Sequence, residues 1–221
     1  MFGKIRDRKR IIFIGAGIVI ILLAGLRMSS RYLVYSDMPV RKSDIIVLFI
    51  GPDEKARQNE ARQLIREGFS DFLFVSSYLR LYRAGGNGNI LSAVPLPMTR
   101  TDGIELRPKF EYENNGLYFK RVRREFDIPF FYENTHVEIL LTKKVMDAYG
   151  FKKAIFVSMP YHMRRIKIIT EKVFGTEYDI KMAPSQFEKQ NNVFSLLRCN
   201  LSYSFMEYPK IIWFISYEAL V

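Results

Sequence analysis

The sequence is poor in the side chains that form disulfides and bind metals. It contains one cysteine, Cys199, and two histidines, His136 and His162, among 221 residues. A single cysteine cannot form a disulfide within the chain, and these three residues fall short of the four ligands of a structural zinc site. The sequence therefore predicts no disulfide framework and no metal site, and no residue pattern in it identifies a cofactor.

Acidic residues are too few to balance the basic ones, and the net charge is +11. The excess is concentrated at one end of the chain. Residues 1–10 carry five basic groups and one acidic group, Arg27 and Arg31 add two more positive charges, and residues 32–221 carry a net charge of only +5. Because nucleic-acid-binding proteins concentrate cations on the folded domain, we expect no nucleic-acid partner.

Long hydrophobic runs are also scarce, with one exception at residues 11–26 (IIFIGAGIVIILLAGL), which contain no charge. This length approaches the ~20 residues of a spanning helix. A cleaved signal peptide would need a small-residue cleavage site, which the following AGLRMSSRY does not offer. A buried core helix would show a polar face. We therefore predict an uncleaved signal anchor, with the lipid bilayer as partner through residues 11–26.

The charges that flank this run predict its orientation. Five basic residues precede it and two follow it, so the positive-inside rule places the N-terminus in the cytoplasm. We expect a single-pass protein of a bacterial inner (cytoplasmic) membrane. Residues 1–31 would form the basic tail and anchor, 32–43 a linker, and 44–221 an extracytoplasmic domain.

The remainder of the chain alternates between apolar runs and helical patterns. The runs typical of buried parallel strands are 44–51, 72–77, 152–160 and 177–184. The helical patterns are 52–68, 133–149, 161–175 and a C-terminal segment of one or two helices broken near Pro209. This alternation predicts an α/β fold with a doubly wound, Rossmann-like, mostly parallel sheet in three layers.

Residues 78–126 interrupt the alternation. Residues 78–100 contain glycines and prolines without a period and predict a long loop, whereas 103–126 alternate on both sides of Asn114-Asn115-Gly116 and predict an inserted β-hairpin. The hairpin arms are rich in Arg, Lys, Phe and Tyr. They would either contact lipid headgroups, glycan or an envelope protein partner, or protect a sheet edge from aggregation.

Polar clusters follow the predicted strands at Gly51 to Arg57, at Ser76-Ser77 and at Ser158 to Arg165. With the segment ENTHVE (133–138), they resemble the YdcF-like domain family, which includes envelope proteins of the SanA and ElyC type. The most specific match is VSMPYHMRR, in which Tyr161, His162 and Met163 match the family's YHM and Arg165 its following arginine. The resemblance covers about residues 43–185.

This chain departs from the family pattern at three points. The first strand is followed by one glycine instead of two or three, and Ser76-Ser77 replaces a Ser-Gly pair. A glutamate on the family's next helix has no clear counterpart. The resemblance implies a Rossmann-like domain, often membrane-anchored, with a role in cell-envelope integrity and a phosphate-bearing or nucleotide-like ligand.

Two residues are the catalytic candidates, His162 and Glu138. In the first turn of a helix, His162 would have its neutral form favoured and could transfer a proton near neutral pH; alternatively it would only bond a neighbouring backbone carbonyl. Thr135 and Glu138 fit the capping box S/T-x-x-E, a structural interpretation that competes with a ligand role.

Ligand binding is predicted for residues that follow the strands or begin the helices. We expect Arg57 to reach an anion at the Gly51 turn, and Arg165 instead of Arg164 to face the site, since adjacent helical residues point about 100° apart. The candidates are Gly51, Arg57, Ser76, Ser77, Asn134, Thr135, Ser158, Tyr161 and Arg165. We expect His136 on the surface. No Gly-x-Ser-x-Gly elbow is present, so a serine hydrolase is not predicted.

These patterns and the resemblance together give one leading hypothesis of function. The domain would bind, and in a stronger form act on, a phosphorylated or polar envelope metabolite. Two alternatives stay open: a non-catalytic scaffold in envelope assembly that uses the basic hairpin, and a cytoplasmic binder of a nucleotide-like cofactor. The sequence does not decide whether the protein is an enzyme.

Overall fold

The computed structural model describes residues 31–51, 54–85, 91–94, 115–186 and 193–220, together with Gly25 and Met28. The strands are β1 (Ile45–Leu48), β2 (Phe72–Val75), β3 (Arg80–Ala84), β4 (Leu91–Val94), β5 (Lys153–Ser158) and β6 (Asp179–Pro184). The helices are α2 (Glu54–Arg66), α3 (Asn115–Glu125), α4 (Asn134–Tyr149), α5 (Met163–Phe174) and α6 (Val193–Glu218), with short 3₁₀ turns η1 (Ser76–Tyr78) and η3 (Pro160–His162).

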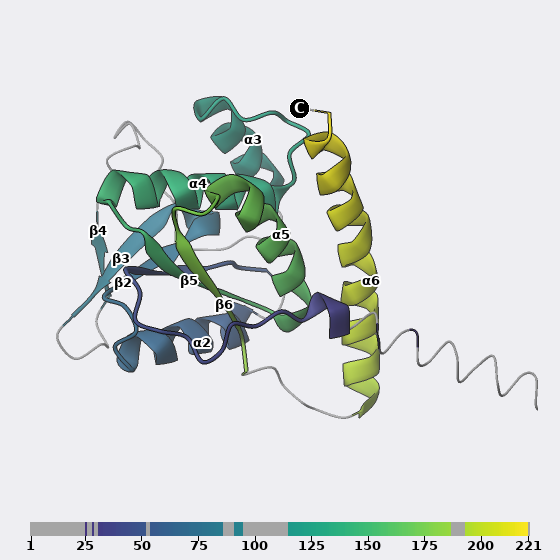
Figure 1. Ribbon diagram of the computed structural model, residues 1–221, viewed down its shortest axis with the longest axis horizontal. Coiled ribbons are helices and arrows are strands. Elements are labelled where there is room, and N and C mark those ends of the chain that lie inside the picture. Colours follow the sequence, from purple (N-terminus) through teal and green to yellow (C-terminus); the bar gives the residue numbers. More distant parts are fainter. Residues whose placement is uncertain are drawn as a thin grey trace, which may run out of the picture.

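The six strands form one sheet in the order β4-β3-β2-β1-β5-β6 (Figure 1). Strands β2, β1, β5 and β6 pair in parallel, while β3 and β4 are antiparallel. The predicted α/β class and mostly parallel sheet are confirmed. From β1 the chain passes to β2 on one side and later to β5 on the other, so the topological switch point lies between β1 and β5.

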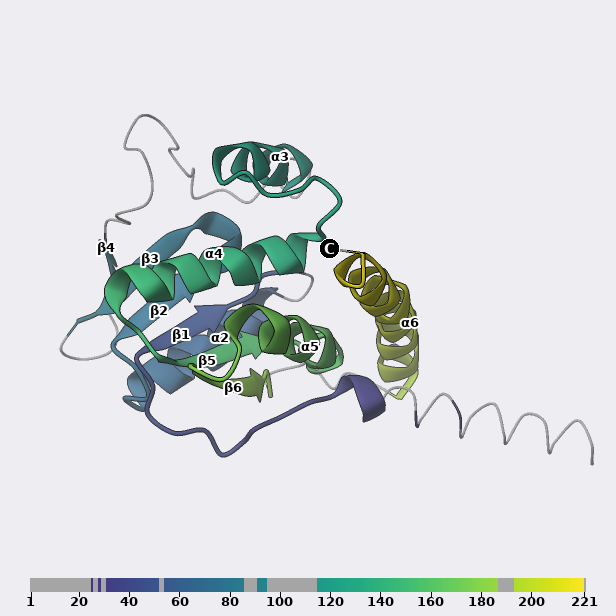
Figure 2. The same cartoon turned by 45° about the horizontal axis from the view of Figure 1, so that its top comes forward.

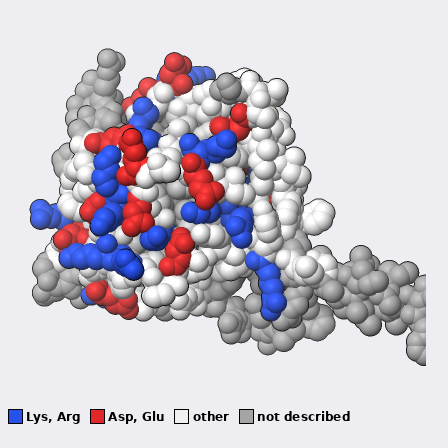
Figure 3. Space-filling view, in the orientation of Figure 1, with Lys and Arg blue, Asp and Glu red and all other residues white. Residues whose placement is uncertain are grey.

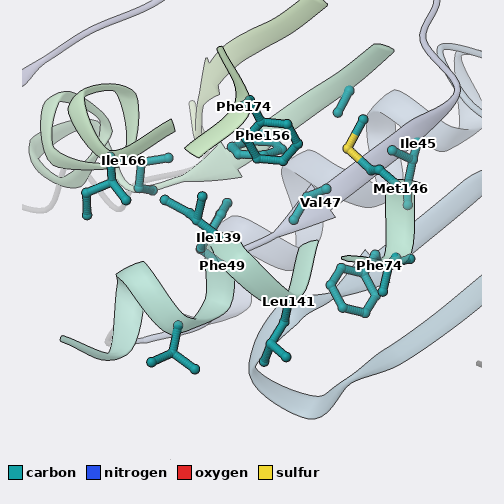
Figure 4. Close-up of a cluster of buried hydrophobic side chains, with 14 of the residues drawn as sticks. Ile45, Val47, Phe49, Phe74, Ile139, Leu141, Met146, Phe156, Ile166 and Phe174 are labelled. Carbon is teal, nitrogen blue, oxygen red and sulfur yellow. The ribbon is translucent and has the colours of Figure 1, made fainter. Parts of the chain in front are cut away.

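Helices cover both faces of the sheet, and the continuous apolar run of β1 follows from that. Ile45, Val47 and Phe49 pack with residues of α4 and α5, whereas Ile46 and Leu48 pack with Leu64 of α2. Successive strand residues point to opposite faces, so both faces need apolar side chains. Figure 2 shows α2 on one side of the sheet and α4 and α5 on the other, and Figure 4 shows the larger cluster between Phe49, Ile139 and Ile166.

The segment predicted as a loop and a hairpin folds differently. Strands β3 and β4 form an antiparallel pair within residues 80–94 and extend the sheet beyond β2, so the 78–100 loop prediction is wrong for its described parts. The predicted second hairpin arm is helix α3, which buries Phe119 and Val122. The hairpin prediction is therefore wrong there, while its first arm lies outside the described residues. Basic residues at positions 120, 121, 123 and 124 lie between and beside the apolar residues, and this produced the apparent alternation of a strand. In the helix, Phe119 and Val122 lie three residues apart and therefore share one buried face.

The C-terminal segment is one helix, and the predicted break near Pro209 is wrong. Proline removes one backbone hydrogen bond and costs a helix interior about 3 kcal/mol or more. Helix α6 continues through Pro209, and it is held by buried side chains on both sides: Glu207 before the proline, and Ile211 and Phe214 after it. Tertiary packing thus outweighs the local signal.

Residues 32–43, predicted as a linker, lie along the domain. The backbone N–H of Asp37 donates to the Met182 carbonyl and its carboxylate accepts from the Met182 N–H, both at 2.9 Å. Leu33 is fully buried. Of the predicted span 11–26, the structure describes only Gly25, and among the described helices none is both long and apolar enough to cross a membrane.

Candidate functional site

The predicted polar clusters converge where the parallel strands end. Ser77 follows β2, Gly51 follows β1, and Ser158 and His162 close β5 and η3. Glu138 lies in the first turns of α4, which covers one face of the sheet, and its carboxylate accepts a hydrogen bond from Ser77. This edge includes the switch point between β1 and β5, which is where open α/β sheets bind ligands. The structure thus brings the predicted clusters to one edge of the sheet, and their role as a ligand site stays a prediction.

Arg57 is buried under the turn that follows β1. Its side chain is 1% exposed, and Nη1 donates to the Phe49 carbonyl at 2.9 Å. A Cβ atom on Gly51 would lie 2.9 Å from the same Nη1. A glycine at position 51 therefore makes room for the guanidinium, which lies at the Gly51 turn, while the predicted binding of an anion there stays a prediction.

Glu138 is buried beside Ser77, whose hydroxyl donates to the Glu138 carboxylate. Burial raises the pKa of Glu138 from 4.5 to about 7, although Ser77, the positive charges of Arg57 and Arg165, and Ser76 each lower it. A carboxyl group with a pKa near 7 is half protonated at neutral pH. It can therefore both donate and accept a proton, which is the property that general acid–base chemistry requires.

The capping-box interpretation of Thr135 and Glu138 is wrong. Helix α4 begins at Asn134, so Glu133 and not Thr135 holds the N-cap position, and no side-chain cap forms. Thr135 Oγ1 instead lies 3.4 Å from Nε2 of His162, and Glu138 faces Ser77. Both side chains therefore contact residues at the ends of the strands and not the backbone of their own helix. These contacts agree with the alternative interpretation of Thr135 and Glu138 as site residues.

His162 is held as a neutral imidazole in a defined tautomer. A guanidinium can only donate, and Nη2 of Arg165 lies 2.5 Å from Nε2 of His162, so Nε2 accepts and carries no proton. The ring proton then sits on Nδ1, 3.4 Å from Ser158 Oγ. Burial, followed by the charges of Arg165, Arg57 and Lys210, lowers the pKa of His162 well below 6.5. The predicted neutral form is confirmed.

Arg165 meets His162 as predicted, but its charge is already balanced. Its Nη1 donates to Glu133 Oε2 at 2.5 Å and its Nε to Glu207 Oε2 at 2.6 Å. Lys210 Nζ lies 3.1 Å from the other oxygen of Glu207. The side chains of Arg165 and Glu207 are 5% and 4% exposed. The cluster thus ties α5 to the start of α4 and to α6, and a ligand would meet a compensated guanidinium.

Neither carboxylate of this cluster, Glu133 or Glu207, is among the site residues predicted from the sequence. Glu133 was placed in the ENTHVE segment without a role, and Glu207 lies in a C-terminal segment far from any matched motif. One signal was available for Glu207: it is one of four charged residues in the otherwise apolar and polar stretch 193–221. A charge in such a segment indicates a buried partner.

Three other residues predicted to bind a ligand, Ser76, Tyr161 and Asn134, contact parts of the fold itself. Ser76 donates to the Leu48 carbonyl at 3.3 Å and joins the ends of β1 and β2. Tyr161 packs with Ala56 and Met159 on the α2 side. The Asn134 side chain accepts from Arg123 Nη2 at 2.9 Å, at an exposed position where α3 meets α4, so the structure does not bring it to the other site residues.

His136 is buried, which corrects the expectation that it lies on the surface. It is 2% exposed, its Nδ1 lies 2.9 Å from the Tyr217 hydroxyl, and its ring stacks on Tyr132 at 4.3 Å. Burial lowers the pKa of His136 to about 4. This neutral histidine is the polar contact through which α4 holds the end of α6.

A cavity of about 300 Å³ lies beside α2, away from these residues. Its lining includes Met38, Glu60, Leu64 and Gln186. Glu60 accepts a hydrogen bond from the Gln186 N–H at 2.8 Å, and burial raises the pKa of its carboxyl group. None of the predicted site residues lines this cavity.

Comparison with protein-family models, with curated proteins and with solved structures finds no match for this chain.

Proposed function

We propose that this is a membrane-anchored envelope protein whose α/β domain binds a small ligand carrying a phosphate or another anionic group and exchanges a proton with it through Glu138. The observation that carries the proposal is the placement of Arg57 and Glu138 at the switch point of the sheet, where the charge of Arg57 acts on both Glu138 and His162. The membrane and envelope parts rest on residues 11–26 and on the YdcF-like resemblance.

The ligand's anionic group would sit near Gly51, where α2 begins and η3 leads into α5. Helix N-termini carry partial positive charge and attract anions. Gly51 is half-buried and the His162 side chain keeps 12% of its surface exposed, so solvent reaches this edge. Arg57 would supply positive charge at this edge, because Arg165 is already bound by Glu133 and Glu207.

The geometry favours Glu138 over His162 as the group that transfers the proton. The Nε2 lone pair of His162 is taken by Arg165, and its pKa lies well below neutral. Glu138 combines a pKa of about 7 with a direct contact to Ser77. His162 then acts by orienting Ser158 and Thr135 around the ligand.

Thermal unfolding of the full chain in detergent tests the binding step. Inorganic phosphate, adenosine monophosphate and phosphatidic acid serve as probes, with Arg57→Met and Glu138→Gln as variants. Arg62, exposed on the same helix α2, provides the matched control Arg62→Met. We expect a probe to raise the midpoint of wild type and Arg62→Met but not of Arg57→Met. A shift that survives in Arg57→Met would reject the assignment of the anion site.

The catalytic step has its own measurement. If phosphate is released from a probe, Glu138→Gln should lower the rate constant by about 10²- to 10⁴-fold, the usual contribution of a general acid–base group, while probe binding persists. Equal turnover by Glu138→Gln and wild type would exclude Glu138 from the chemistry. A C-terminal alkaline phosphatase fusion, active only outside the cytoplasm, tests the compartment and separates the envelope proposal from the cytoplasmic alternative.

A scaffold function remains the second candidate, now with a different surface. Helix α3 packs on α4 through Phe119 and Val122 and leaves Lys120, Arg121 and Arg124 exposed. This basic face replaces the predicted hairpin as a contact for an acidic partner. If the scaffold function is correct, charge reversal of these three residues should abolish envelope function and Glu138→Gln should leave it intact. If the ligand site is required instead, Glu138→Gln should abolish envelope function and the charge reversal should leave it intact.

A further inference from the structure

The outward side of α6 is largely apolar from Phe205 to Ser216. Phe205, Met206, Ile212, Trp213 and Ile215 are each between 51% and 73% exposed. With a rotation of 100° per residue these positions, Pro209 and Ser216 fall on one half of the helix surface, while Glu207, Ile211, Phe214 and Tyr217 are buried on the other half. Exposed patches of this kind mark interaction surfaces.

The patch offers almost no polar group to water. Its hydroxyl-bearing positions between residues 205 and 216 are Ser216, whose Oγ donates to the Ile212 carbonyl within the helix at 2.8 Å, and Tyr208, whose ring stacks on Tyr32. The indole N–H of Trp213 donates to the Phe131 carbonyl at 3.1 Å. Figure 3 shows charged side chains over the left and centre of the molecule, whereas the surface over α6, on the right, is almost entirely uncharged.

The path of the chain places this surface next to the hydrophobic run. Tyr32 stacks on Tyr208 of α6 with ring centroids 6.4 Å apart, and Figures 1 and 2 both show the helical turn at residues 31–33 beside α6. Tyr32 follows the end of the run by six residues. Six residues span about 9 Å as a helix and about 20 Å when extended, so a bilayer that holds residues 11–26 has its surface within reach of α6.

We propose that the outward face of α6 lies on the bilayer surface as a second membrane contact, with Trp213 and Ile212 at the level of the lipid headgroups and upper acyl chains. Trp is enriched at this level of membranes, and helices with one apolar face bind there. Arg164 packs on Tyr32 with its Cζ 4.7 Å from the ring centroid, which adds positive charge at the rim for anionic headgroups. The inference rests on the anchoring of residues 11–26, not on the ligand site.

The tether favours the bilayer over a second copy of the chain. An anchored domain meets its own bilayer at a high effective concentration, without the loss of translational freedom that association with a second molecule involves. The site formed by Arg57 and Glu138 would then be held at a fixed height above the membrane, because α6 also carries Glu207, which binds Arg165.

Trp213 is the only tryptophan and reports on this contact directly. The full chain is reconstituted into vesicles of phosphatidylethanolamine and phosphatidylglycerol, with or without bromine atoms on the upper acyl chains. We expect brominated lipid to quench Trp213 emission, and the emission maximum to lie further to the blue in vesicles than for an indole in water. Unquenched emission from protein that is inserted in the vesicles would overturn the proposal.

Paired substitutions separate contact from anchoring. Phe205→Glu combined with Ile212→Glu should reduce the quenching and shift the emission to the red, with the protein still retained by the vesicles. Met38→Glu is the matched control, since Met38 is 38% exposed beside α2, and it should leave the quenching unchanged. The single variant Ile212→Glu serves if the double variant fails to fold. Shielding that depends on the protein-to-lipid ratio without lipid quenching would instead indicate a second copy and reject the proposal.

Discussion

Arg165 donates to Nε2 of His162 at 2.5 Å while its other donors are bound by Glu133 and Glu207. Two residues that the sequence places three positions apart on a helix therefore act as a structural pair. The arginine fixes the tautomer of the histidine, and the two carboxylates fix the arginine. In the proposed function, proton transfer then falls to Glu138, whose carboxylate accepts a hydrogen bond from the Ser77 hydroxyl.

The raised pKa of Glu138 predicts a loss of stability as pH rises. A carboxyl group with a pKa of 4.5 when unfolded and about 7 when folded stabilises the fold fully below pH 4.5, and this contribution disappears as pH rises through 7. The shift corresponds to about 3 kcal/mol in the free energy of unfolding. Glu138→Gln should remove this pH dependence, as measured by urea titration in detergent between pH 4.5 and 8. A parallel decline in both proteins would show that another group is responsible.

The close approach of Gly51 and Arg57 predicts coupled effects of substitution. Gly51→Ala places a Cβ 2.9 Å from Arg57 Nη1, and the buried guanidinium must move away from the Phe49 carbonyl. We expect a loss of about 1–3 kcal/mol in the free energy of unfolding, typical of overpacking. The backbone at Gly51 is not in the left-handed region, so the cost comes from the side chain.

Arg57→Ala provides the test of that cause. In an Arg57→Ala background, the further change Gly51→Ala should cost little, because the space is empty. Urea titrations of the two single variants and the double variant form a cycle whose coupling energy measures the contact. Additive effects would mean that Gly51 is required for a reason other than the guanidinium.

The parallel strands were predictable because the central ones are buried on both faces and therefore apolar, as Ile45, Ile46, Val47 and Leu48 of β1 illustrate, whereas β3 and β4 were not predicted. The parts that were not predicted depend on contacts distant in sequence. Helix α3 shows no dominant pattern of its own and forms by packing Phe119 on α4. The same cause explains the unbroken α6 and the burial of His136, which both depend on docking between α4 and α6.

The positions of the candidate site residues were predictable from the sequence, whereas their hydrogen bonds were not. Local motifs placed Gly51, Ser77, Glu138 and His162 at the correct edge, since strand ends in a parallel sheet share one side. The local motifs did not indicate which hydrogen bonds these side chains form. No local pattern could indicate that Glu207, 42 residues from Arg165 along the chain, would neutralise the arginine.

The carboxylates around Arg165 predict a strongly non-additive response. Arg165→Met leaves Glu133 without its guanidinium partner and Glu207 with Lys210 alone, and breaking a buried ion pair costs about 3–5 kcal/mol. Adding Glu207→Gln removes one of the stranded charges, so the double variant should be more stable than the sum of the single changes indicates. Lys167→Met on the same helix α5, where the lysine forms an exposed i,i+4 pair with Glu171, is the control and should change stability by less than about 1 kcal/mol.

The lowered pKa of His136 predicts that acidification weakens the docking of α6. A histidine with a pKa of 6.5 when unfolded and about 4 when folded contributes stability that is present above pH 6.5 and lost as pH falls through 4, because the buried site excludes the charged form.

This pH trend is opposite to that of Glu138, so the wild type must be compared with a variant that differs only at His136. His136→Phe keeps an aromatic ring between Tyr132 and Phe214 and cannot titrate. Between pH 6.5 and 4, the thermal midpoint of the wild type should fall relative to that of His136→Phe, and Trp213 emission, close to Tyr217 at 5.9 Å, should change in the wild type alone. An unchanged difference between the two proteins over this range would mean that His136 does not control the attachment of α6.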